Sequence, residues 1–422
     1  MSRIHRIVAR EVLDSRGNPT VEAEVHVHGG AWGRAIVPSG ASTGAAEAHE
    51  LRDGDATRYE GRGVRRAVAH VLETIAPALV GCDPVDQQTV DRRLLALDDT
   101  PQKTRLGGNA LLAVSLAAAH AGAAVRRVPL YRHLSELFRE IDPAAPAPRM
   151  PVPMINMISG GLHAGGNLDF QDFLILPTGA ESLAAGLEWS VRIYRQLGRL
   201  LAEAGFEGRL VGDEGGYGPR LTSNAQAAEF VVRAIEAAGL AAGRDVTLAI
   251  DVASTHFFDG QHYRLAATGE ARLTSEQMIE QLAELVERSP ITSIEDGLAE
   301  EDWPGWQQLT ARLGSRVKLV GDDLFATNAL RLERGIELGA ANSILIKVNQ
   351  IGTLSETLDT IRLARAHGYA YVVSARSGET EDSTIADLAV ATAADSIKIG
   401  SIVRGERLAK YNQLLRIAEE LV

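Results

Sequence analysis

Short apolar runs that end in charged residues recur along the second half of the chain. Each run is long enough for one β-strand, and six charged residues stand at or just beyond the ends of these runs. They are Asp251, Glu295, Asp322, Lys347, Arg376 and Lys398. After a first gap of 44 residues, their spacings of 27, 25, 29 and 22 fit one strand and one helix per step. The pattern predicts an α/β fold, a (β/α) barrel in which these side chains meet at the carboxyl ends of the strands.

The first third of the chain follows a different pattern. Residues 20–38 alternate apolar and polar positions around Gly29 and Gly30, which predicts a β-hairpin. Helical patterns come next, and the apolar stretch 111–125 is too short to span a bilayer. We therefore expect a buried helix there. Strands followed by helices are typical of an α+β domain.

A proline-rich connection separates the two patterns. Five prolines lie between Pro143 and Pro153, and neither a helix interior nor a central strand accepts such a run. We expect an N-terminal α+β capping domain at residues 1–142 and a C-terminal barrel at residues 143–422. Beyond the boundary, Thr274 begins a sequence typical of a helix capping box.

Composition narrows the class of protein. A chain of 422 residues with 45% hydrophobic content can fill two cores, as a soluble enzyme would. The net charge of -12, without a basic stripe, argues against nucleic-acid or membrane-surface partners. Cys82 is the only cysteine, so no internal disulfide can form and a reducing compartment is favoured. The N-terminus has no apolar core typical of a signal peptide.

The residue types at the predicted strand ends indicate a chemistry. Asp251, Glu295 and Asp322 offer the oxygen ligands that a hard divalent cation prefers. Lys347 and Lys398 would face them and could take a proton or bind an anion. Together these residues predict metal-assisted proton abstraction.

Nine motifs in consistent order resemble the enolase family from end to end. They are DSRGNPTVE (14–22), VPSGASTG (37–44), HAGG (163–166), VGDEGG (211–216), SIED (293–296), GDDL (321–324), KVNQIGTLSE (347–356), RSGETED (376–382) and ERLAKYNQLLRI (406–417). The resemblance implies an enolase-type (β/α)8 barrel of ββαα(βα)6 order beside an N-terminal α+β domain. It also implies cytoplasmic homodimers or homo-octamers that use two Mg²⁺ ions to interconvert 2-phosphoglycerate and phosphoenolpyruvate.

The resemblance assigns roles around the two metal ions. Asp251, Glu295 and Asp322 match the ligands of the first Mg²⁺, so the second acid of each doublet, Asp296 or Asp323, would not be a ligand. Ser42 matches a mobile-loop ligand of the second Mg²⁺, an assignment that rests on resemblance alone because such loops are often simple turns.

Further roles concern proton transfer and substrate binding. Lys347 matches the general base, and we expect Lys398 and the metal ions to lower its pKa. Glu214 matches the acid that protonates the leaving C3 hydroxyl. The resemblance assigns substrate contacts to a further group of residues. These are His163, Gln171, Asp172, Arg376 and Ser377 at the phosphate or leaving-group side, and Lys398 at the substrate carboxylate.

Several departures from the family gather on the leaving-group side. Asp172 replaces a glutamate and is one methylene shorter, which would retract its carboxylate by about 1 Å, and a displacement of about this size can cost 10²-fold in rate. Ala375 replaces a histidine before Arg376, and residues 398–406 also depart from the family pattern. Three functions stay open: enolase chemistry, a paralogous transfer reaction such as that of carboxyphosphonoenolpyruvate synthase, and a non-catalytic binding protein that keeps the fold.

Overall fold

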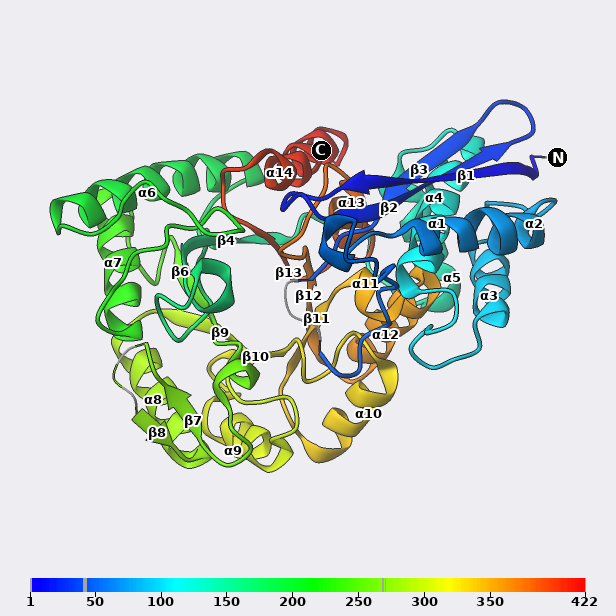
Figure 1. Ribbon diagram of the computed structural model, residues 1–422. Helices are drawn as coiled ribbons and strands as arrows, with labels where there is room; N and C mark the ends of the chain where they lie inside the picture. Colours follow the sequence, from blue (N-terminus) through cyan, green and yellow to red (C-terminus); the bar gives the residue numbers. More distant parts are fainter. Residues whose placement is uncertain (1, 41–43, 268, 270, 422) are drawn as a thin grey trace.

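A closed eight-stranded barrel forms the C-terminal part of the protein (Figure 1). The computed structural model describes residues 2–40, 44–267, 269 and 271–421. The barrel strands are β4 (Val152–Ser159), β5 (Asp172–Leu176), β6 (Thr247–Asp251), β9 (Ile291–Glu295), β10 (Lys318–Gly321), β11 (Ser343–Ile346), β12 (Ala370–Ser374) and β13 (Ser396–Gly400). Strand β5 runs antiparallel to both neighbours, β4 and β6, whereas the other pairs are parallel. The amino end of β5 therefore lies at the same barrel face as the carboxyl end of β6.

The helices that follow these strands confirm the ββαα(βα)6 order. Two helices come after the first strand pair, and each later barrel strand is followed by a helix. The helices are α6 (Leu183–Glu203), α7 (Asn224–Ala237), α8 (Ser275–Arg288), α9 (Trp303–Leu313), α10 (Ala329–Leu338), the short α11 (Val348–Ile351), α12 (Leu354–Ala366), α13 (Thr384–Ala391) and α14 (Gly405–Glu420). A small hairpin, β7 (Tyr263–Leu265) and β8 (Ala271–Leu273), lies between β6 and α8. The predicted capping box at Thr274 is confirmed at the start of α8.

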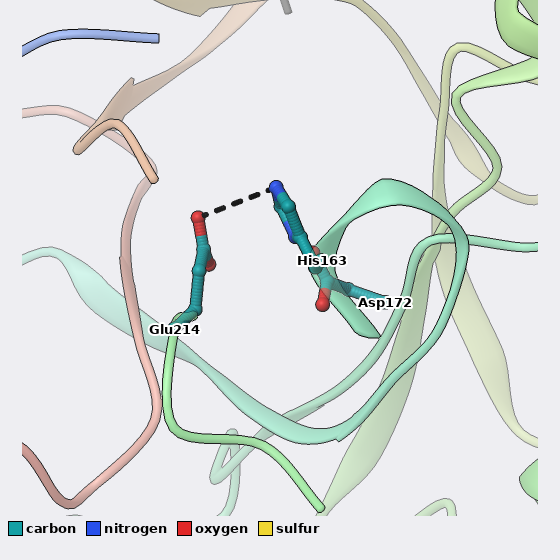
Figure 2. A group of neighbouring side chains, drawn as sticks. All are labelled: His163, Asp172 and Glu214. Atoms are coloured by element: carbon teal, nitrogen blue, oxygen red, sulfur yellow. Dashed lines mark hydrogen bonds and ion pairs between the residues drawn. The ribbon is translucent and has the colours of Figure 1, made fainter. Parts of the chain in front are cut away.

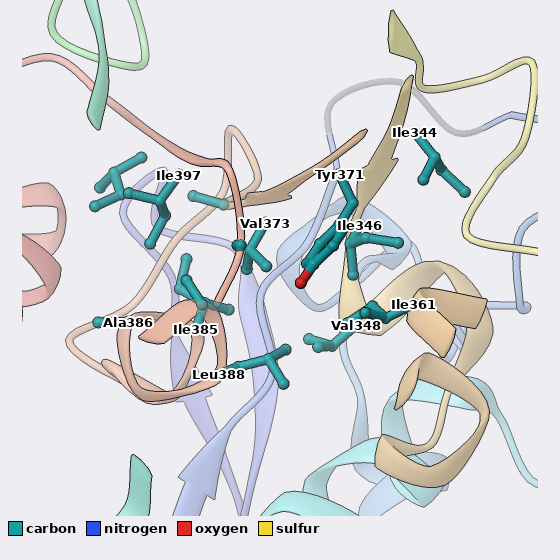
Figure 3. Close-up of a cluster of buried hydrophobic side chains, with 14 of the residues drawn as sticks. Ile344, Ile346, Val348, Ile361, Tyr371, Val373, Ile385, Ala386, Leu388 and Ile397 are labelled. Carbon is teal, nitrogen blue, oxygen red and sulfur yellow. The ribbon is translucent and has the colours of Figure 1, made fainter. Parts of the chain in front are cut away.

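Side-chain alternation along the strands builds two hydrophobic layers. Leu345 and Val372 belong to a separate buried cluster with residues of β4, β5, β6 and β10, which fills the barrel interior. Their neighbours Ile344, Ile346 and Val373 point the other way and pack with side chains of α12 and α13 (Figure 3). Side chains thus alternate between the barrel interior and the outer helices with a period of two residues. A barrel whose strands are covered by helices on the outside requires this alternation.

The N-terminal part combines an antiparallel sheet with helices. Its strands β1 (Ile4–Leu13), β2 (Pro19–Val27) and β3 (Trp32–Ile36) include the hairpin predicted at Gly29 and Gly30. The helices are α1 (Arg65–His70), α2 (Ala76–Leu79), α3 (Gln87–Leu97), α4 (Gly108–Arg126) and α5 (Leu130–Ile141), and a π-helical segment (Val71–Ile75) joins α1 to α2. The division expected after residue 142 falls in the connection between α5 and β4.

Helix α4 is the buried helix that the sequence predicts. By length and composition alone it could cross a membrane, but 83% of its most apolar window is buried inside the protein. It packs on β2 and β3. A Cβ atom on Gly33 would lie 2.2 Å from the Ala121 nitrogen, so only glycine permits this close approach of sheet and helix.

The N-terminal domain also contacts the barrel next to its mouth. Ser39 and Gly378 exchange two backbone hydrogen bonds of 2.8 and 2.9 Å, and the Ala48 nitrogen donates to the Gln350 oxygen at 2.7 Å. The segment that contains residues 44–64 therefore lies against the loops after β11 and β12, where it can add side chains to a site at the barrel mouth.

Candidate active site

The six charged residues at strand ends come together at one face of the barrel. Asp251 and Glu295 end β6 and β9, and Lys398 lies within β13. Asp322 and Lys347 directly follow β10 and β11, and Arg376 lies two residues beyond β12. All are buried except Lys347, which is partly exposed. The placement that the strand spacing predicts is therefore found in the structure.

Lys398 joins two of the carboxylates. Its Nζ donates to Asp251 Oδ2 at 2.7 Å and to both oxygens of Glu295 at 2.8 Å. Burial would lower the pKa of Lys398, but Asp251 and Glu295 outweigh it and raise that pKa well above its ordinary value. The lysine therefore stays charged. Burial and Asp251 together raise the pKa of Glu295 well above its ordinary value, despite the lysine.

Lys347 pairs with the third carboxylate. Its Nζ donates to Asp322 Oδ2, and its backbone nitrogen donates to Thr327 Oγ1 at 2.9 Å, which fixes the start of α11. We expected a lowered pKa for Lys347. Burial does act in that direction, but the adjacent Asp322 outweighs it and raises the pKa. Lys398 does lower this pKa, as expected, although Asp322 outweighs it, and the lowering expected from metal ions stays a prediction.

Asp296 shapes the backbone of the neighbouring acidic loop. Its carboxylate oxygens accept hydrogen bonds of 2.9 Å from the backbone nitrogens of Asp322 and Asp323. Asp296 itself has φ of 42°, an uncommon conformation that turns the chain sharply after β9. The second acid of the SIED motif therefore holds the backbone of the GDDL motif.

The donor set suits a divalent cation. One oxygen from each of Asp296, Asp322 and Asp323 lies within 4.8 Å of the other two, and these residues are buried. Burial and Asp322 raise the pKa of Asp323 to about 7, a sign of excess negative charge. Asp251, Glu295 and Asp322 add the strand-end carboxylates, which Lys347 and Lys398 offset in direct ion pairs. A cation would relieve this repulsion. Which carboxylates would bind it stays a prediction.

A second group of titratable side chains, His163, Asp172 and Glu214, is shown in Figure 2. Because β5 runs antiparallel, its first residue, Asp172, lies beside Ser159 at the end of β4. Asp172 Oδ2 accepts from His163 Nδ1 at 2.8 Å, and Oδ1 accepts from Asn156 Nδ2 and from Ser159 Oγ at 3.1 Å. The His163 Nε2 atom lies 3.9 Å from Glu214 Oε1.

The loop that carries Glu214 is tied to the loop that carries His163. The Asp213 nitrogen donates to the His163 oxygen at 3.1 Å. A Cβ atom on Gly212 would lie 2.5 Å from that same oxygen, so only glycine fits at position 212, two residues before Glu214. Burial alone would raise the pKa of Glu214, but His163 and more distant cations lower it. Glu214 is therefore ionised in this arrangement.

Arg376 is held by a residue of the N-terminal domain. Its Nη1 donates to Glu47 Oε2 at 3.0 Å and to Asn349 Oδ1 at 2.9 Å, and its Nη2 donates to Glu47 Oε1 at 3.3 Å. The fully buried Arg407 donates to the backbone oxygens of Arg376 and Ser377, each at 2.6 Å. These contacts fix the loop that would present a guanidinium to an anion.

One cavity is lined by side chains of both groups. Gln171, Ala375 and Ser377 line it, as do His163, Glu214, Asp251, Asp322, Lys347, Arg376 and Lys398. Gln171 Nε2 donates to Asp251 Oδ2 at 3.3 Å. Glu295 and Asp172 are not among the lining residues, since both lie behind other side chains. Ser42, predicted to bind a second metal, lies outside the described residues.

The sequence analysis missed several residues of the site. Glu47 neutralises Arg376, and Gln350 Nε2 donates to Asp322 Oδ1 at 2.9 Å. His256, in a 3-10 helix just after β6, lines the cavity. Two of them offered a signal in the sequence: His256 follows a predicted metal ligand by five residues, and Gln350 belongs to the KVNQIGTLSE motif. Glu47 could not be found in that way because it belongs to the other domain.

The fold and the site together define a class of protein. An eight-stranded barrel of ββαα(βα)6 order, with buried acids and lysines at its mouth and an α+β domain beside it, is the architecture of the enolase superfamily, whose members include metal-dependent lyases. The family model for the enolase N-terminal domain matches residues 4–134. The model for the enolase C-terminal TIM barrel domain matches residues 147–422. The chain belongs to the enolase family.

Proposed function

We propose that this protein is a magnesium-dependent lyase that interconverts 2-phosphoglycerate and phosphoenolpyruvate. The observation that carries the proposal is the pair of lysines, Lys347 and Lys398, that faces buried carboxylates in one cavity. Such an arrangement can bind a small phosphorylated carboxylate, hold a divalent cation and remove a proton next to a carboxylate. Membership of the family supports the same chemistry.

Substrate orientation follows from the positions of the cations. Lys398, buried at the cavity, would bind the substrate carboxylate, and Arg376 with Ser377 would bind the phosphate. Lys347, which directly follows β11, the strand between β10 and β12, would then face C2. When bound, Mg²⁺ would neutralise the negative charge that develops on the carboxylate as the C2 proton leaves.

Lys347 must lose its proton before it can act as the base. In the pair with Asp322 its pKa is raised, so the ammonium form is favoured. Ligation of a cation by the Asp322 carboxylate would compete with this ion pair and lower the pKa of Lys347. Asp322 therefore links the charge state of the base to the metal site.

The alternative is a transfer reaction of the carboxyphosphonoenolpyruvate synthase type. Ala375 favours it, because this small residue lines the cavity immediately before Arg376, and its backbone nitrogen donates to the Lys398 oxygen at 2.8 Å. The alanine side chain leaves space beside the substrate's anionic groups and contributes no hydrogen bond. The protein would then join an enolpyruvate unit to a carboxyphosphono group supplied in nucleotide-activated form, with the nucleotide as the leaving group.

Turnover of 2-phosphoglycerate with Mg²⁺, followed by phosphorus NMR, tests the proposal. Conversion to phosphoenolpyruvate that stops on addition of a chelator is the expected result. Binding of phosphoenolpyruvate without conversion would favour the transfer reaction, and neither binding nor conversion would favour a non-catalytic protein. We also propose a cytoplasmic homodimer or homo-octamer, which light scattering of the purified protein would distinguish from a monomer.

A further inference from the structure

Glu47 of the N-terminal domain forms a two-pronged ion pair with Arg376 at the barrel mouth. Its Oε2 accepts from Arg376 Nη1 at 3.0 Å, and its Oε1 accepts from Arg376 Nη2 at 3.3 Å. The side chain of Glu47 is 5% exposed and that of Arg376 is 3% exposed. Hydrogen bonds between two such charged groups are among the strong ones in proteins. The protein itself therefore balances much of the charge that Arg376 would offer to an anion.

Further contacts hold Glu47 behind the guanidinium. Its Oε1 also accepts from the Gly44 nitrogen at 3.0 Å and from Gln350 Nε2 at 3.4 Å. Arg376 lines the cavity, whereas Glu47 is not among the lining residues. The carboxylate thus contacts the guanidinium from the N-terminal domain and not from within the cavity. A phosphate in the cavity would therefore meet Arg376 without displacing Glu47, and the two anions would share one cation.

A carboxylate that shares the guanidinium with a phosphate lowers the affinity for that phosphate. The two anions repel each other, and burial strengthens the repulsion because it lowers the effective dielectric constant. Asn349 makes a neutral contact with the same guanidinium, since its Oδ1 accepts from Arg376 Nη1 at 2.9 Å. Glu47 and Asn349 therefore both orient Arg376, but only Glu47 brings a negative charge. The effect of charge on ligand affinity can thus be separated from the effect of orientation.

We propose that Glu47 is a positioning residue that acts through Arg376 and limits how tightly the site holds a phosphorylated ligand. The inference rests on the proposed function, which assigns the ligand phosphate to Arg376. Without the charge of Glu47, the buried guanidinium would hold a phosphate more tightly. Because affinity differences between related complexes lie mostly in the dissociation rate, phosphoenolpyruvate would then leave more slowly. The N-terminal domain thereby sets a property of the barrel's ligand site.

Two variants change the charge beside Arg376 in opposite directions. Glu47→Gln removes a negative charge and keeps the length of the side chain, whereas Asn349→Asp adds a negative charge next to the same Nη1 atom. Calorimetric titration with phosphoenolpyruvate in the presence of Mg²⁺ measures the affinity of each protein. We expect Glu47→Gln to bind about tenfold more tightly than the wild type and Asn349→Asp about tenfold more weakly, as repulsion between close charges implies.

Glu356→Gln is the matched control. Glu356 of α12 accepts from Nζ of the buried Lys103 at 2.7 Å, so this pair also joins the N-terminal domain to the barrel. Neither residue is among those that line the cavity. Glu356→Gln should lose stability in urea, as Glu47→Gln should, but it should bind phosphoenolpyruvate with wild-type affinity. The ligand should therefore restore more stability to Glu47→Gln than to Glu356→Gln.

Unchanged or weaker binding by Glu47→Gln would overturn the proposal, because Glu47 would then only orient Arg376. Asn349 is partly exposed, so Asn349→Asp decides the question if Glu47→Gln does not fold: binding as tight as that of the wild type would refute the charge effect. A wild-type protein that bound no phosphoenolpyruvate would also refute it. If the wild type bound this ligand but did not convert 2-phosphoglycerate, the proposed function would fail, while the ranking of the variants would still decide the role of Glu47.

Discussion

Replacing Lys398 with methionine should destabilise the metal-free protein far more than the magnesium-bound protein. The lysine is 5% exposed, and its Nζ bonds Asp251 and Glu295 at 2.7 and 2.8 Å. Methionine keeps much of the side-chain length but leaves both carboxylates buried without their cation. Breaking a buried ion pair in this way costs about 3–5 kcal/mol. We expect a loss of that size in the presence of a chelator.

Magnesium should offset much of this loss, because it would bring positive charge to the same carboxylates. At a free concentration of 100 times Kd, a ligand that binds only the folded state adds about 2.7 kcal/mol to the free energy of unfolding. The gain should be larger for Lys398→Met than for the wild type, since the unpaired carboxylates bind the cation more tightly. Urea unfolding with chelator and with Mg²⁺ measures both free energies.

Lys410→Met is the matched control for this experiment. Lys410 is also buried, and its Nζ donates to the Thr380 oxygen and pairs with Glu379, both at 2.6 Å. Its loss should destabilise the protein to a similar extent, but the gain from Mg²⁺ should equal that of the wild type. Equal gains in all three proteins would refute the view that Lys398 and a metal ion neutralise the same carboxylates.

Other predictions follow from the roles assigned to single residues. Lys347→Ala should abolish exchange of the C2 proton, as measured by NMR, while calorimetry shows nearly unchanged Mg²⁺ binding; wild-type exchange would remove this lysine from its role as the base. Asp172→Glu combined with Ala375→His should raise dehydration of 2-phosphoglycerate, and no gain would show that these residues do not limit it. His163 has a folded-state pKa of about 9 against 6.5 in the unfolded chain, so its contribution to stability is fully present below pH 6.5 and is lost as the pH rises through 9. That contribution is about 3 kcal/mol, and His163→Gln should therefore flatten the fall in unfolding free energy over this range, whereas parallel curves would contradict the assignment.

Much of the barrel could be predicted because one unit, a strand followed by a helix, recurs along the sequence. The spacing of the strand ends placed Asp251, Glu295 and Lys398 on one face, and the structure brings them into direct contact. Spacing could not reveal that β5 runs antiparallel, because a short apolar run has the same pattern in either direction. The family resemblance supplied the ββαα order, and the structure shows that the second strand of this order is antiparallel. It matters for the site, because it brings the start of β5 to the barrel mouth.

The contacts between side chains were less predictable than their positions. Glu47 and Arg376 are 329 residues apart and meet only because the N-terminal domain covers the barrel mouth. Asp172 and His163 are close in sequence, but their hydrogen bond depends on the path of the loop between β4 and β5. The raised pKa of Lys347 was also missed, since it depends on which carboxylate the ammonium touches rather than on the overall charge nearby.

Metal-dependent removal of the C2 proton is the central claim, and solvent exchange tests it most directly. The wild-type protein would be mixed with 2-phosphoglycerate in D2O, and the C2 proton signal followed by NMR with Mg²⁺ and with a chelator. The account predicts loss of the signal with Mg²⁺ and its persistence with the chelator, whether or not phosphoenolpyruvate accumulates. A C2 signal that persists in Mg²⁺ while 2-phosphoglycerate is bound would contradict it.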